Sequence, residues 1–170
     1  MAELERLAGI SGEMWAELIA GEHEPFGGIG EALQWREKPV NVGLRDAGGR
    51  LLAAGGVVVA HLRAGEAPLE VAGLGGVIVI RSARGRGLAR TLVPALLAAA
   101  AELGPERAML FCVPRLMPFY AGFGFAEINA PVRADQPGGR IEVPLCAMWK
   151  ALHGEPAWPP GAIELAGEPF

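Results

Sequence analysis

The chain of 170 residues has the length of one domain with its own core, and 51% of it is hydrophobic. Its formal net charge of -4 disfavours a general nucleic-acid binder, because that affinity comes mostly from neutralised phosphates. No apolar stretch reaches the roughly 20 residues that cross a bilayer, so no membrane contact is predicted.

The first residues carry acids and lack the basic start of a signal peptide, which makes the cytoplasm the expected compartment. Cys112 and Cys146, the only cysteines, lie in apolar runs and are expected to be free thiols. With three scattered histidines they form no zinc-like spacing, so no metal site is predicted. The basic residues are nearly all arginine, and we interpret the two lysines, Lys38 and Lys150, as compositional bias.

The N-terminal half is predicted to hold a short strand, two helices and then three strands. Residues 3–10 predict a short strand, and Ser11 is the type of residue that caps a helix, here one through Ile19. The glycine-rich segment after it predicts a loop with a short helix at residues 31–35. Turn residues then separate three predicted strands, at 40–45, 51–62 and 69–80. The last of these ends in an unbroken apolar run, which favours a strand covered on both faces.

The second half continues with a helix from Leu88 that ends before Gly104, interrupted by Pro94. A strand is then predicted at residues 108–113 and a short helix at 114–121. Another strand is expected to start at 123–125, and the last strand is predicted at 141–149. Pro144 favours an edge or a bulge in the last strand. The tail, 151–170, is too apolar for a free linker and is expected to pack on the domain or on a partner subunit. The order predicts an α+β fold with a mixed, mostly antiparallel sheet flanked by helices.

A dense basic turn, IRSARGRGLARTL at residues 80–92, lies between the apolar strand and the helix. The first N–H groups of a helix lack internal partners, glycines let a ligand approach the backbone, and arginines add forked donors for phosphate. The turn therefore predicts an anion site. It lacks the P-loop pattern, and Arg90 stands where a dinucleotide fingerprint needs its third glycine.

Two motifs carry a family resemblance. Residues 84–89 read R-x-x-G-x-A, and residues 120–125 fit Y-x-x-x-G-F within the stretch LFCVPRLMPFYAGFGF. In both, the chain resembles the GNAT superfamily of acetyl-CoA-dependent N-acetyltransferases. The resemblance covers about residues 69–125, the cofactor half of such a fold, and implies a single GNAT-like domain over 1–170.

The resemblance also implies roles for individual residues. The backbone of the last apolar strand would bond the pantetheine arm and polarise the acetyl carbonyl, and the basic turn would hold the pyrophosphate of acetyl-CoA. Tyr120, the only tyrosine, would protonate the departing thiolate. The cofactor-binding residues implied are Val77, Ile78, Val79, Arg84, Gly85, Arg86, Gly87, Leu88, Ala89 and Arg90.

A general base is not identified. Where some relatives carry a base glutamate, this chain has Gly73, and strand parity turns Glu70 the other way. The remaining candidates are the residues of the loop beside the expected cleft and the C-terminal carboxylate of Phe170, if the tail folds over that cleft. The loop residues are Glu22, His23 and Glu24, with Phe26 and Trp35 as possible lining.

The chain also differs from the family pattern in the segment between the predicted strand at 108–113 and Tyr120. Many members of the family carry an asparagine there that contacts the pantetheine. This chain has none there, and Arg115 is left either to reach a phosphate or to be solvated.

The leading interpretation is therefore acetyl transfer from acetyl-CoA to a primary amine of a small molecule or peptide. Acidic surface near the entrance would suit a polyamine, an aminoglycoside or a lysine side chain. A non-catalytic acyl-CoA-binding module and an unrelated nucleotide-binding protein are the alternatives, and a homodimer is compatible with the tail.

Overall fold

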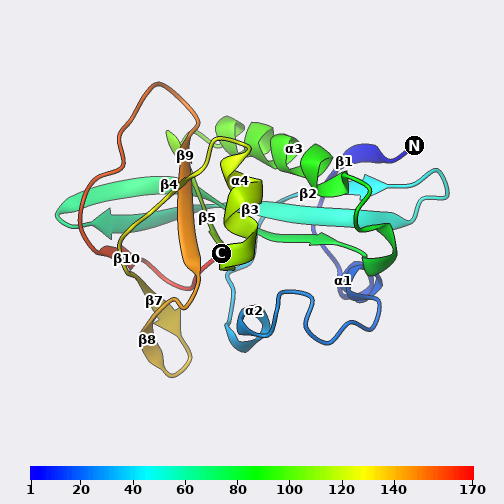
Figure 1. Cartoon of the computed structure of the whole chain (residues 1–170), viewed down its shortest axis with the longest axis horizontal. Helices are drawn as coiled ribbons and strands as arrows, with labels where there is room; N and C mark the ends of the chain where they lie inside the picture. The colour runs from blue at the N-terminus through cyan, green and yellow to red at the C-terminus, as the bar shows by residue number, and fades with distance from the viewer.

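A computed structural model describes all residues, 1–170. A ten-stranded sheet forms the body of the molecule (Figure 1). The strands are β1 (Glu3–Leu7), β2 (Val40–Arg45), β3 (Leu51–Ala64), β4 (Ala67–Val79), β5 (Arg107–Cys112), β6 (Ala126–Glu127), β7 (Val132–Gln136), β8 (Gly139–Glu142), β9 (Cys146–Ala151) and β10 (Ile163–Leu165). The helices are α1 (Gly12–Ile19), α2 (Ile29–Ala32), α3 (Leu88–Glu102) and α4 (Met117–Ala121), with 3-10 turns at η1 (Arg81–Ala83) and η2 (Pro114–Leu116).

The strands follow the order β6-β9-β5-β4-β3-β10-β7-β8, with β2 also paired to β3 and β1 paired to β2. Only two pairs are parallel, β4 with β5 and β10 with β7. The sheet is thus mixed and mostly antiparallel, which confirms the predicted fold class.

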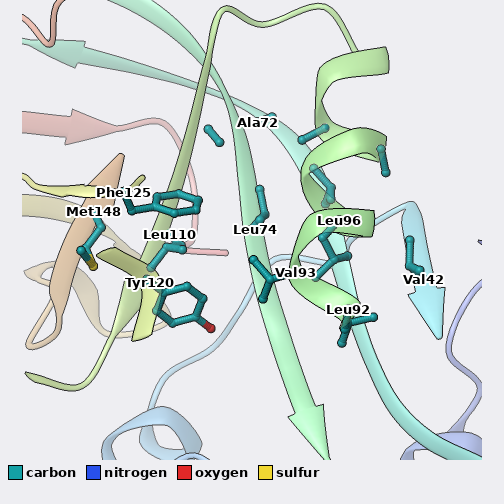
Figure 2. Packing of buried hydrophobic residues seen from close by; sticks show 14 of the residues in the cluster. Val42, Ala72, Leu74, Leu92, Val93, Leu96, Leu110, Tyr120, Phe125 and Met148 are labelled. Carbon is teal, nitrogen blue, oxygen red and sulfur yellow. The ribbon is translucent and has the colours of Figure 1, made fainter. Parts of the chain in front are cut away.

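Helices cover both faces of the sheet. The apolar stripe of α3, with Leu92, Val93 and Leu96 all buried, packs on one face against Leu74 of β4 and Val42 of β2 (Figure 2). On the other face, α1 buries Leu18 against β3 and the end of β4. The apolar end of β4 is therefore covered on both sides, as its unbroken hydrophobic run predicts. None of the helices combines the length and apolarity that a membrane crossing needs.

The start of α1 is as predicted, and that of α2 is not. The Ser11 hydroxyl accepts a hydrogen bond from the Met14 N–H at 3.2 Å and caps α1. The second helix lies at Ile29–Ala32 and not at residues 31–35, so the prediction was wrong by two residues at the start and three at the end. The cause is Glu31, whose carboxylate accepts from the N–H groups of Phe26 and Gly28 and so fixes an earlier start.

The C-terminal strands correct the prediction further. The expected strand at 141–149 is two strands, because Pro144 cannot donate to a ladder and β8 and β9 pair with different neighbours. Strands β7 and β10 were not predicted. The tail does pack on the domain, since β10 inserts between β3 and β7.

Candidate active site

The strands β4 and β5 separate partway along their length. Their parallel pairing covers only residues 72–74 of β4, although β4 continues to Val79 and β5 to Cys112. Gly76 has a φ of 61°, and the register of β3 with β4 shifts at this point. This bulge turns β4 away from β5, so the edge of residues 75–79 that faces β5 has no strand partner.

The basic turn has the free donors of an anion site. Gly85 and Gly87 have φ of 77° and 78°, conformations that favour glycine, and Gly87 precedes α3 without any side-chain cap. The backbone N–H groups of residues 85–89 donate to no acceptor within the protein. Five unpartnered donors at the positive end of a 15-residue helix suit a phosphate.

The Arg84 side chain holds the turn in place and does not point into the anion site. Its guanidinium donates to both carboxylate oxygens of Glu22, at 2.9 and 2.6 Å, and to the carbonyl of Val79 at 3.0 Å. The hydrogen bonds to Arg84 lower the pKa of Glu22. The pair ties the loop after α1 to the turn, so any contact of Arg84 with an anion is expected through its backbone.

Arg86 and Arg90 remain on the exposed side of the turn. Arg86 makes no hydrogen bond to protein, and the Arg90 guanidinium lies 6.0 Å from the centre of the Phe119 ring. Their side chains are therefore available to an anion held by the backbone donors.

A cleft of about 240 Å³ lies where β4 and β5 separate. Its lining comes from both strands, the loops around α2, the α4 region and the tail. It includes Trp15, Phe26, Trp35, Lys38, Gly75, Gly76, Val77, Phe111, Cys112, Arg115, Tyr120 and Phe170. Its two charged residues, Lys38 and Arg115, are basic, and no carboxylate side chain or imidazole lines it. Phe26 and Trp35, which the sequence left as possible lining, do line the cleft.

Tyr120 is 7% exposed and lines the cleft from α4. Its ring packs edge-on against Phe119 and Phe125, and its hydroxyl points away from Phe125 and Met148 (Figure 2). Burial raises its pKa well above the ordinary value, with a further contribution from Cys112. The phenol therefore stays protonated across the working pH range and can donate a hydrogen bond. Burial also raises the pKa of Cys112 to about 11, so its thiol stays neutral.

The tail closes one end of the cleft. Phe170 is 1% exposed, its ring lies 5.3 Å from that of Phe111, and a side chain at Gly73 would overlap it. Arg36 holds the segment before it, donating through Nε and Nη2 to the Glu168 carbonyl at 3.0 and 2.8 Å and through Nη2 to the carbonyl of Ala166. The tail thus folds over the cleft, as the interpretation of Phe170 required.

The other base candidates do not line the cleft. Glu22 is paired with Arg84, and neither His23 nor Glu24 contributes to the lining. Glu70 faces outward, 3.7 Å from His61. None of these side chains is positioned to take a proton inside the cavity, and the base role of the Phe170 carboxylate stays a prediction.

Sequence reasoning missed Lys38. Its side chain lines the cleft, its amine donates to the Arg36 carbonyl at 3.2 Å, and it forms no ion pair with an acidic side chain. Burial, and then the charge of Arg36, lower its pKa to about 8. The signal that could have found it was the scarcity of lysine in an arginine-rich chain, which we had assigned to composition.

The chain was compared with known proteins by sequence and by structure. No curated protein matches by sequence. Among solved structures, the Escherichia coli GNAT family N-acetyltransferase YhbS, in complex with CoA, is 19% identical with a TM-score of 0.63, covering 96% of this chain and 88% of that one. A GNAT family acetyltransferase from Brucella melitensis, in complex with acetyl-CoA, is 17% identical with a TM-score of 0.58, covering 96% and 94%.

The Escherichia coli ribosomal-protein-S18-alanine N-acetyltransferase is 16% identical with a TM-score of 0.58, covering 93% of this chain and 99% of that one. At these identities the likeness shows the fold. A family model, "Acetyltransferase (GNAT) family", matches residues 13–125, a span that includes the separated strands, the basic turn and Tyr120. The chain therefore belongs to the GNAT acetyltransferase family.

Proposed function

We propose that this protein transfers the acetyl group of acetyl-CoA to the primary amine of a small molecule or peptide, by direct attack of the amine on the thioester. The observation that carries the proposal is the run of five unpartnered N–H groups at residues 85–89, next to an open strand edge that leads into the cleft. The turn fits a pyrophosphate, and the strand edge fits an extended arm bearing amides.

Three parts of the site would each take a role that the family resemblance implies. The backbone of Val77, Ile78 and Val79 would hold the pantetheine arm and polarise the acetyl carbonyl. The turn from Arg84 to Arg90 would hold the pyrophosphate. Tyr120, kept neutral by burial, would donate toward the sulfur as the C–S bond breaks. Acetyl-CoA would supply an acetyl group activated as a thioester, with the thiolate of CoA as the leaving group.

The cleft lining favours an acceptor with one amine on an apolar body. Aromatic rings of Trp15, Phe26, Trp35, Phe111 and Phe170 form much of the wall. Both charged side chains of the lining are basic, and its single carboxylate is the terminal one of Phe170. A polyamine or aminoglycoside would bring several further cations into this cavity without a carboxylate side chain to pair with them. We therefore rank monoamines ahead of the polycationic acceptors that the acidic composition suggests.

Thermal unfolding with acetyl-CoA, CoA, ATP and NAD tests the cofactor assignment. A ligand at about 100 times its dissociation constant adds roughly 2.7 kcal/mol, a shift of about 5–10 °C for a domain of this size. We expect acetyl-CoA and CoA to shift the midpoint, and ATP and NAD to leave it nearly unchanged. Equal shifts with ATP would instead support a general nucleotide site.

Turnover separates an enzyme from a non-catalytic acyl-CoA-binding module. A panel of amines with acetyl-CoA, read as free CoA thiol, is expected to show release that depends on the amine. Binding of acetyl-CoA without amine-dependent release across aromatic, aliphatic and peptide amines would favour the non-catalytic module.

A further inference from the structure

Two glycines make room for the Lys38 side chain. Gly56 of β3 and Gly75 of β4 are register partners, and the lysine stem lies over both. A Cβ at Gly56 would lie 2.7 Å from Lys38 Cβ, and one at Gly75 would lie 2.5 Å from Lys38 Cε. The stem therefore crosses the sheet from β3 to β4 and brings its amine to the cleft.

The Lys38 stem ends where strands β4 and β5 separate. Gly75 is the first residue of β4 beyond the pairing with β5, and Gly76 and Val77 follow at the bulge. Under the proposed function, the thioester carbonyl is bound by the β4 backbone just after this point, with Tyr120 in the same cavity. The amine of Lys38 therefore shares a cavity of about 240 Å³ with the proposed position of the thioester.

The charge state of Lys38 is compatible with a nucleophile. With a pKa of about 8, about a tenth of the amine is neutral at pH 7, whereas an ordinary lysine is neutral far less often. The charged or titratable groups around it are Arg36 in the segment before β2, the terminal carboxylate of Phe170, which lies beside the Lys38 stem at Gly75, and Cys112, Arg115 and Tyr120 in the lining of the cleft. The amine is also poorly solvated, which favours attack.

We propose that Lys38 is itself an acetyl acceptor, so that the protein acetylates its own cleft. The inference rests on the proposed function, because it needs acetyl-CoA in that cavity. The neutral Nζ attacks the thioester carbon, an N–C bond forms, and the C–S bond breaks. The sulfur takes a proton donated by Tyr120, the new amide loses one proton from nitrogen, and that proton restores the phenol through solvent. The products are Nε-acetyl-Lys38 and CoA.

The consequence for the cleft is a change of both charge and volume. The amide of acetyl-lysine is neutral and larger than the ammonium, and it occupies the part of the cavity beside Gly75. Acetylation of Lys38 would therefore oppose the binding of an amine acceptor while leaving the turn at residues 85–89 free to hold CoA.

Peptide mass spectrometry of the purified protein after incubation with acetyl-CoA tests the proposal. The chain contains its own control, because Lys150 is the only other lysine and is half-buried like Lys38. We expect Lys38 to gain one acetyl group at least about 10-fold faster than Lys150, because only Lys38 lines the cleft in which the thioester is proposed to lie. The rate should rise with pH through about pH 8 and then level off. Equal labelling of the two lysines, or equally fast labelling of Lys38 when the protein is unfolded in urea before acetyl-CoA is added, would overturn the proposal.

Two variants complete the test. Lys38→Arg keeps a charged stem of similar length and is expected to abolish the mass gain, whereas Lys150→Arg should leave it unchanged. The thermal shift with acetyl-CoA is measured on the same samples. A normal shift without acetylation of Lys38 overturns this inference and leaves the proposed function intact, whereas no shift with acetyl-CoA or CoA means that the proposed function itself has failed.

Discussion

At the scale of single residues, Tyr120 illustrates how burial prepares a group for its role. Replacing it with phenylalanine removes only the hydroxyl and keeps the ring packed against Phe119 and Phe125. We expect Tyr120→Phe to lower kcat by about 100-fold or more while the thermal shift with CoA is retained. Because burial raises the pKa of the phenol, the wild-type rate should not fall near the ordinary tyrosine pKa of about 10. Unchanged turnover in the variant would assign Tyr120 to packing alone.

Lys38 gives a second prediction at this scale, on stability. Its pKa falls from 10.5 unfolded to about 8 folded, so the unfolded state binds more protons between these values and stability must rise with pH across them. The neutral variant Lys38→Met lacks this dependence. At pH 7 we expect the variant to unfold at a higher temperature than the wild type, with the difference shrinking as the pH rises from about 8 to 10.5. The check is a series of unfolding curves against pH, and a parallel pH dependence in both proteins would show that the amine is solvated.

At the scale of elements, the turn before α3 can be separated from the helix that it starts. Gly87 and Gly104 lie just before and just after α3, both have positive φ, and neither has an atom within 4 Å of an added Cβ. Alanine at either position should therefore destabilise by a similar amount, about 1–2 kcal/mol from backbone strain. Only Gly87→Ala should weaken CoA binding, by about 10-fold, because it moves the free N–H groups. Calorimetric titration of both variants with CoA makes the comparison, and equal affinities would exclude the turn as the pyrophosphate site.

Elements also show what sequence alone can predict. Strands β2 and β4, α3 and the α4 region were predicted within a few residues, because their hydrophobic periods and their glycine and proline boundaries agree. The short helix α2 and strands β7 and β10 carry weak local signals, and long-range contacts decide their positions. The cleft shows the same division. The turn and Tyr120 were predicted from motifs, whereas Lys38 and the ring of Phe170 reach the cleft by tertiary packing over glycines.

At the scale of the whole molecule, Arg36 connects the segment before β2 to the tail. Its guanidinium donates to the carbonyls of Ala166 and Glu168, and its own N–H donates to Pro169 at 2.8 Å. We expect Arg36→Met to cost about 2–4 kcal/mol, since charge-assisted hydrogen bonds to two carbonyls are lost. Amide hydrogen exchange should increase first in residues 166–170.

The matched control for this variant is Arg133→Met. Arg133 also meets the tail, but only through an exposed ion pair with Glu164 at 3.6 Å, which contributes little. Similar losses of stability in the two variants would argue against Arg36 as the residue that holds the tail over the cleft.

The position of β10 also dictates an order of assembly. β10 is the last strand along the chain, yet it lies inside the sheet and joins β3 to β7. During synthesis the hairpin of β7 and β8 therefore has no place on the sheet until β10 has left the ribosome. The N-terminal strands and α3 can associate earlier, because their contacts lie within the first part of the chain. Residues 163–170 thus attach the hairpin and complete the wall of the cleft, so a nascent chain should bind the acceptor only after this segment has been made.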